Sequence, residues 1–96
     1  MSLRYTYNWI SNPIRPDGNQ TCFDVGNYLV SIIDDGYGAQ QDLFEMAVID
    51  KISSEFVSLP GIVEEDGVAG YLTLSEIDMK LTKLSSITGE MPIQRY

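Results

Sequence analysis

The chain has 96 residues with 14 acidic and 6 basic side chains, a formal net charge of −8, no histidine and one cysteine. These counts exclude a catalytic site built on a histidine base, a zinc site of cysteine and histidine ligands, and an internal disulfide. The negative charge also disfavours nucleic acids and anionic membrane surfaces as partners, and it favours a basic protein.

The length predicts a single domain over residues 1–96. No apolar run approaches the roughly 20 residues that span a bilayer, and the N-terminus lacks the apolar core of a signal peptide. Together with the lone Cys22, these features predict a cytoplasmic protein. We interpret residues 1–3 as a cloning remnant, and we expect residues 90–96 to form a frayed tail.

The first predicted element is a strand over Arg4–Ile10, where aromatic and polar residues alternate. This spacing places Tyr5, Tyr7 and Trp9 on one face. Packing under the helix, contact with a protein partner and stacking against a ligand all fit such a stripe. The scarcity of cations disfavours the stacking role, because stacking platforms for nucleic acids are accompanied by basic grooves. The three residues are therefore candidates for the core and for partner binding.

After a proline-rich loop, the sequence predicts an antiparallel meander. Its strands are expected over Thr21–Val25, Tyr28–Asp34, Leu43–Ile49 and Glu55–Leu59. Gly26-Asn27 fits a two-residue hairpin turn and equally a bulge inside one long strand. Pro60 ends the last of these strands.

A helix follows, and its signals are the clearest in the chain. Thr73 and Glu76 match a capping box, with Thr73 as the N-cap, and Gly89 suits the C-terminal end. Between them, apolar residues recur at helical spacing and form one stripe: Leu74, Ile77, Leu81 and Leu84.

These elements predict an α+β fold, with a small antiparallel sheet of three to five strands and one C-terminal α-helix packed on one face. One helix covers one face of such a sheet. The other face must then be polar or buried against a second subunit, and the apolar content of the strands favours a homodimer.

Two acidic turns are the remaining candidates for partner binding. Asp34 and Asp35 follow one strand, while Glu64, Glu65 and Asp66 lie in a turn before the helix. We expect both turns at one end of the sheet, where they would form an acidic patch or serve solubility alone. Adjacent carboxylates on a loop are not preorganised for a metal, so no metal site, cofactor or catalytic residue is expected.

The segments Leu43–Ile49 and Val68–Glu76 resemble small uncharacterised phage-encoded acidic proteins. These proteins share a strand, a variable acidic turn and a Gly-aromatic-Leu-Thr lead into the last helix. The family has no assigned activity, so the resemblance implies a phage or prophage origin and transfers no functional residue.

The sequence thus predicts a non-enzymatic protein–protein interaction module with a basic protein partner, acting as a host-directed inhibitor or an accessory factor. One alternative is an immunity protein that neutralises a basic toxin. Another is a small carboxylate-dependent enzyme, which would need two carboxylates about 5–10 Å apart in a deep pocket.

Overall fold

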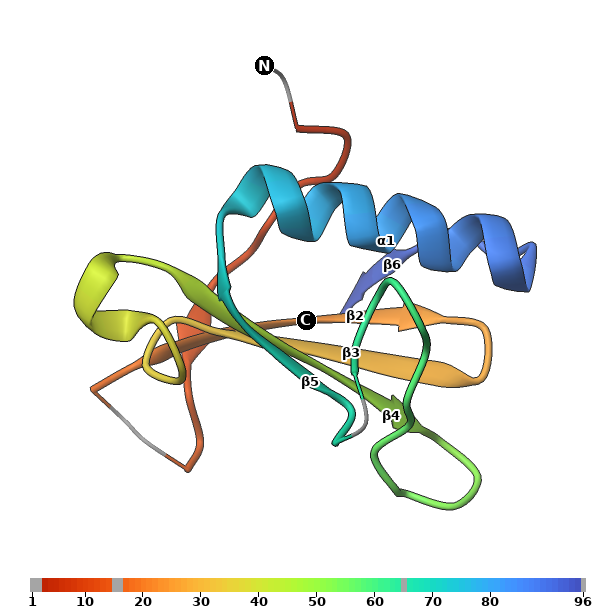
Figure 1. Cartoon of the computed structure of the whole chain (residues 1–96), viewed down its shortest axis with the longest axis horizontal. Helices are drawn as coiled ribbons and strands as arrows, with labels where there is room; N and C mark the ends of the chain where they lie inside the picture. Colours follow the sequence, from red (N-terminus) through yellow and green to blue (C-terminus); the bar gives the residue numbers. More distant parts are fainter. Residues whose placement is uncertain (1–2, 15–16, 65, 96) are drawn as a thin grey trace.

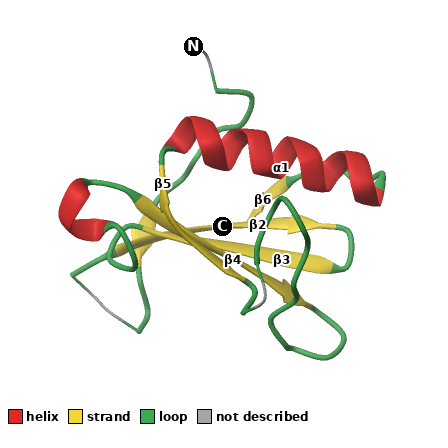
Figure 2. Ribbon diagram, in the orientation of Figure 1, coloured by secondary structure: helices red, strands yellow, loops and turns green. Residues whose placement is uncertain are grey.

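The computed structural model describes residues 3–14, 17–64 and 66–95, which form one antiparallel sheet with a single long helix on one face (Figures 1 and 2). The strands are β1 (Ile10–Ser11), β2 (Asn19–Val25), β3 (Tyr28–Ile33), β4 (Phe44–Asp50), β5 (Val68–Leu72) and β6 (Ile93–Arg95). The helix α1 spans Leu74–Thr88, and a 3₁₀ turn spans Ala39–Gln41. The predicted α+β fold is confirmed, with six strands in place of the three to five expected.

The sheet runs in the order β1-β2-β3-β4-β5, and β6 joins the outer edge of β2 beside β1. β1 pairs with β2 at Asn19 and Gln20, and β6 pairs with it from Cys22 to Asp24. The two ends of the chain therefore share one edge of the sheet.

The C-terminal tail is more ordered than the sequence predicted. Residues 93–95 form β6, although residues 90–96 were expected to fray. The Gln94 amide donates hydrogen bonds to the Thr21 hydroxyl at 2.6 Å and to the Cys22 carbonyl at 2.8 Å. Because the ladder and this side chain both bind β2, the tail is held by the sheet.

Gly26 and Asn27 form a hairpin turn, which decides between the two interpretations of this dipeptide. Val25 pairs directly with Tyr28, so two residues connect β2 to β3. Gly26 has a φ of 59°, which glycine adopts at little cost, and primed hairpin turns require such a positive φ.

The helix begins and ends where its sequence signals predicted. The Thr73 side chain accepts a hydrogen bond from the Glu76 backbone N–H at 3.2 Å, and the Glu76 carboxylate accepts one from the Thr73 N–H at 3.0 Å. Gly89 ends the helix in the left-handed conformation. Among the described residues, no helix is long and apolar enough to cross a membrane.

The core lies between α1 and the face of the sheet that it covers. Ile77, Leu81 and Leu84 of the helix are fully buried there. The connection from β4 to β5 adds Ile62 and Val63, and Lys80 of the helix holds it by a 2.6 Å hydrogen bond to the Ile62 carbonyl. The sheet contributes Phe23, Val25, Val30, Ile32, Met46, Val48 and Leu72.

The predicted strand over Arg4–Ile10 is wrong for most of its length, since only its last residue belongs to β1. The backbone N–H groups of Arg4 and Tyr5 donate to Asp78 Oδ2 on the helix, at 2.9 and 3.2 Å. The Asn8 N–H donates to the Gln94 side chain at 2.9 Å. Side-chain oxygens thus accept hydrogen bonds from the backbone N–H groups of this segment, in place of the carbonyl groups of a neighbouring strand.

The predicted strand over Glu55–Leu59 is also wrong. Phe56 makes one isolated bridge to Ile49, and Leu59 makes one to Val63. The edge of β4 over Phe44–Ala47 is occupied by β5, a strand that the sequence did not predict. Little of the β4 edge is left for residues 55–59 to pair with.

Candidate functional site

The face of the sheet opposite α1 lacks a covering helix (Figure 1). Apolar side chains from four neighbouring strands line a hollow on this face. The strand register arranges these side chains in rows across the sheet. A central row of small residues is formed by Cys22, Ser31 and Ala47, and it continues to Val68 of β5. We call this surface the open face.

Two further rows flank the central one. On one side Leu29 pairs with Ile49, which is bridged to Phe56. On the other side Ile33 stands between Gln20 and Glu45. These outer rows are four residues apart along each strand, or roughly 13 Å, which is wide enough for one helix or one extended segment of another chain.

The open face is hollowed along its centre, with a volume of about 400 Å³. Small side chains form its floor, while larger apolar side chains stand higher on both sides. Ile14 is 86% exposed at one margin, and Phe56 is 60% exposed at the other. Large apolar side chains that border a shared hollow and remain in water are typical of interaction surfaces.

Cys22 lies on this floor as a free, half-buried thiol. Burial raises its pKa, which outweighs the opposing hydrogen bond with Ser31. The thiol therefore stays protonated near neutral pH, which disfavours a nucleophilic role, and it presents a small apolar surface on the floor of the hollow.

Asp24 sits beside the open face and pairs with two cations. Its carboxylate accepts from Arg95 at 2.6 Å and from Lys51 at 2.7 Å. The hydrogen bond from Arg95 lowers the pKa of Asp24 most, and the hydrogen bond from Lys51 lowers it further. Two cations around one carboxylate leave a local excess of one positive charge beside the open face, within a chain whose net charge is −8.

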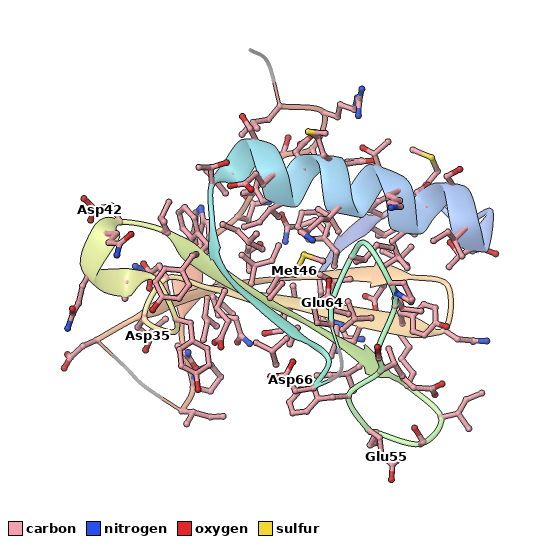
Figure 3. The ribbon with its side chains drawn as sticks, in the orientation of Figure 1. Asp35, Asp42, Met46, Glu55, Glu64 and Asp66 are labelled. Carbon is pink, nitrogen blue, oxygen red and sulfur yellow. The ribbon has the colours of Figure 1, made fainter. Side chains whose placement is uncertain are left out.

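The two predicted acidic turns lie at opposite ends of the sheet, and the expectation of a single acidic end is wrong. β3 and β5 both run antiparallel to β4, so they run parallel to each other. Asp34 and Asp35 follow the end of β3, whereas Asp66 precedes the start of β5. Figure 3 shows Asp35 far from Glu64 and Asp66. Glu65 lies outside the described residues.

The described members of these turns also stabilise local structure. Asp34 accepts from the backbone and side chain of Asn19, at 2.7 and 2.9 Å. Asp35 accepts from the Asn12 amide at 3.4 Å, next to the Ile14 margin of the open face. Asp66 accepts from the Val68 N–H at 3.1 Å, beside the opposite margin. Carboxylates therefore flank the apolar hollow at both ends.

The predicted aromatic candidates pack inside the molecule. The rings of Tyr5 and Tyr7 meet Phe23 edge-on, with centroid distances of 6.3 and 5.4 Å, and Trp9 stacks on Phe44 at 5.2 Å. All three side chains are half-buried against the core. Their partner-binding role stays a prediction, and the packing favours the core interpretation.

Among the residues that the structure describes, no three carboxylate or thiol groups are placed to hold a metal ion. The sequence predicted that the sheet face opposite the helix is either polar or buried against a second subunit, but it did not identify the side chains that form the hollow. The signal for these side chains was the alternation of the two faces along Leu43–Ile49. It places Ala47 and Ile49 on the face opposite the buried Met46 and Val48. Comparison with protein-family models, curated proteins and solved structures finds no match to this chain.

Proposed function

We propose that this protein is a non-enzymatic interaction module whose open face binds an apolar segment of a basic protein. The observation that supports this most directly is the unequal cover of the sheet. One face is sealed by α1, the N-terminal segment and the β4–β5 connection, while the other leaves Leu29, Ile49 and Phe56 around an unfilled hollow.

Charge favours a basic partner over a second copy of the chain. Each copy carries a net charge of −8, so two open faces brought together would confront like charges at close range. A basic protein would instead place apolar side chains in the hollow and cations near Asp35 and Asp66, at its two ends. In the phage setting that the sequence resemblance implies, such a partner would be a host protein or a basic toxin.

A selection from yeast-displayed random peptides tests this proposal. Peptides that bind the immobilised chain are expected to combine two or more apolar residues with flanking lysine or arginine. Binding should fall with ionic strength, because exposed charges are screened beyond about 8–10 Å at physiological salt.

Ala47→Arg is the variant that tests the location, because it introduces a bulky cation on the floor of the hollow. Ser86→Arg adds the same charge on the exposed surface of α1 and serves as the control. We expect Ala47→Arg to abolish binding of the selected peptides and Ser86→Arg to preserve it. Equal binding to both variants would refute the open face as the site, and the absence of any enriched peptide would refute the proposed function.

A further inference from the structure

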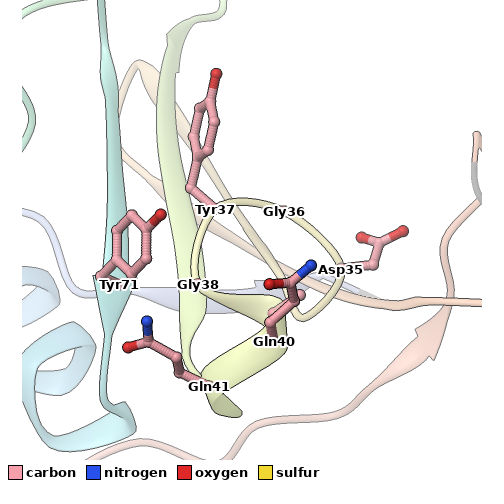
Figure 4. Close-up of a pocket in the computed structure, with 8 residues that line it drawn as sticks. Asp35, Gly36, Tyr37, Gly38, Gln40, Gln41 and Tyr71 are labelled. Carbon is pink, nitrogen blue, oxygen red and sulfur yellow. The ribbon is translucent and has the colours of Figure 1, made fainter.

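A second hollow, of about 380 Å³, lies beside the open face and is lined by residues 35–41 and Tyr71 (Figure 4). Gly36 links the two surfaces. It belongs to the lining of this hollow, and a methyl group at its Cα would overlap the carboxylate of Glu45, which borders the open face. A chain bound on the open face could therefore reach the second hollow without a break.

Two tyrosines are presented to solvent at this hollow. Tyr37 is 65% exposed and Tyr71 is 57% exposed, unlike the three N-terminal aromatic residues, which pack on the core. Exposed tyrosines that border a hollow are enriched at protein-binding sites, because their rings offer a large contact area at little entropic cost.

The backbones of these two tyrosines are held side by side. The Tyr71 N–H donates a 3.0 Å hydrogen bond to the Tyr37 carbonyl. Gly38, at a φ of 103°, packs so closely that a methyl group there would lie 2.9 Å from the Cα of Tyr71. Tyr71 itself has a φ of 57°, a conformation that β-carbon-bearing residues adopt at an energetic cost. Strained backbone positions of this kind cluster at functional sites, which makes Tyr71 a candidate binding residue.

The polar groups around the rings suit a cation with several N–H donors. Gln40 and Gln41 contribute side-chain amides to the lining, whereas the carboxylate of Asp35 points away from the two rings (Figure 4) and accepts from the Asn12 amide. Of the cations in the described part of the chain, none lines this hollow. The site thus combines aromatic faces and amide oxygens, within a chain whose net charge is −8.

We infer that this hollow binds the guanidinium group of an arginine carried by the basic partner. A guanidinium is planar, stacks on aromatic rings and donates five N–H groups in fixed directions, so it can use the tyrosines and the glutamines together. A lysine ammonium is more strongly hydrated and lacks the planar fork. This inference rests on the proposed function, because it assigns one residue of the same partner.

The peptide selection tests the inference when it is run in parallel on the wild type and on the double variant Tyr37→Ala/Tyr71→Ala. Wild-type binders should carry arginine in excess at a fixed distance from their apolar residues. Binders of the double variant should keep the apolar residues and lose that excess. An equal arginine excess on both proteins, or none on the wild type, would overturn the arginine site while leaving the open face intact.

A binding cycle measures the same contact quantitatively. One selected peptide is compared with its citrulline form, which keeps the shape of arginine without its charge, by fluorescence anisotropy. The exchange should weaken binding to the wild type about tenfold, and binding to the double variant less than about twofold. A similar loss on both proteins would contradict the inference.

Tyr71→Gly separates loss of the ring from loss of the fold. Glycine relieves the positive φ, so this variant should melt at the same temperature as the wild type or higher. It should nevertheless show a smaller penalty for citrulline than the wild type. If Tyr71→Gly keeps the full tenfold penalty, the Tyr71 ring does not bind the arginine.

Discussion

The Tyr7 hydroxyl donates a 3.0 Å hydrogen bond to Oδ2 of Asp78, a carboxylate that is only 4% exposed on the covered side of α1. The same oxygen accepts from the backbone N–H groups of Arg4 and Tyr5. Three donors thus converge on one buried charge, which compensates for its removal from water. This arrangement ties the N-terminal segment to the helix and explains why the aromatic stripe belongs to the core.

Tyr7→Phe is expected to lower the free energy of unfolding by about 1–3 kcal/mol, because a charged acceptor loses one of its donors. Chemical denaturation measures this change. Thr6→Ala, at an exposed neighbouring position, is the control and should change stability by less than about 0.5 kcal/mol.

The same bond makes a prediction about alkaline pH. Burial, followed by the hydrogen bond to Asp78, raises the pKa of Tyr7 well above its ordinary value of 10.0. The group therefore stabilises the fold fully below pH 10, and that stabilisation is lost as the pH rises further, since the unfolded tyrosine ionises first. Above pH 10, the stability advantage of the wild type over Tyr7→Phe should shrink. A constant difference between pH 8 and 11 would contradict this account.

Leu81→Ala should cost about 2–5 kcal/mol, because Leu81 is fully buried between the helix and the sheet. Met79→Ala is the matched control, since Met79 lies on the same helix and is 61% exposed. Denaturant melts of both variants measure the difference. Equal stability of the two variants would mean that α1 does not pack on the sheet as described.

The fourth prediction concerns Asp24 and the attachment of β6. Asp24→Asn removes the ion pairs with Lys51 and Arg95 and should cost up to about 1 kcal/mol, because the partners are partly exposed. Arg95 lowers the pKa of Asp24, so its contribution is present above the unfolded pKa and is lost as the pH falls through the depressed folded value. The difference between wild type and Asp24→Asn should be measurable at pH 7, smaller in high salt, and progressively smaller as the pH falls below the ordinary Asp24 pKa of 3.8. A difference that does not decrease with falling pH would show that the carboxylate charge is not its cause.

The helix was predictable from sequence because its signals are local. Thr73, Glu76 and Gly89 each act within one turn of the helix, and no distant partner can change their meaning. The Gly26-Asn27 turn was harder to predict, because a hairpin and a bulge have the same local sequence. They differ in whether Val25 pairs with Tyr28 on a neighbouring strand.

The errors arose where distant segments compete for the same partner. β5 contains Gly70 and has only five residues, so its pattern is weak, yet it occupies the edge of β4 that residues 55–59 would need. The alternation around Tyr7 correctly indicated one shared face, but no local pattern could show that Asp78 would replace a strand as the acceptor. An uncovered face was expected, but its composition was not predictable for the same reason, because cross-strand register alone brings Cys22, Ser31 and Ala47 together.

The central claim is that the open face binds a basic protein, and affinity capture from a bacterial lysate with three immobilised baits tests it most directly. Wild type and Ser86→Arg should capture the same basic protein, Ala47→Arg should not capture it, and high salt should release it. Only the loss of capture by Ala47→Arg supports the conclusion, because a protein that binds nonspecifically would be captured by all three baits. Capture of the same protein by Ala47→Arg, or of a partner that is acidic and insensitive to salt, would contradict the account.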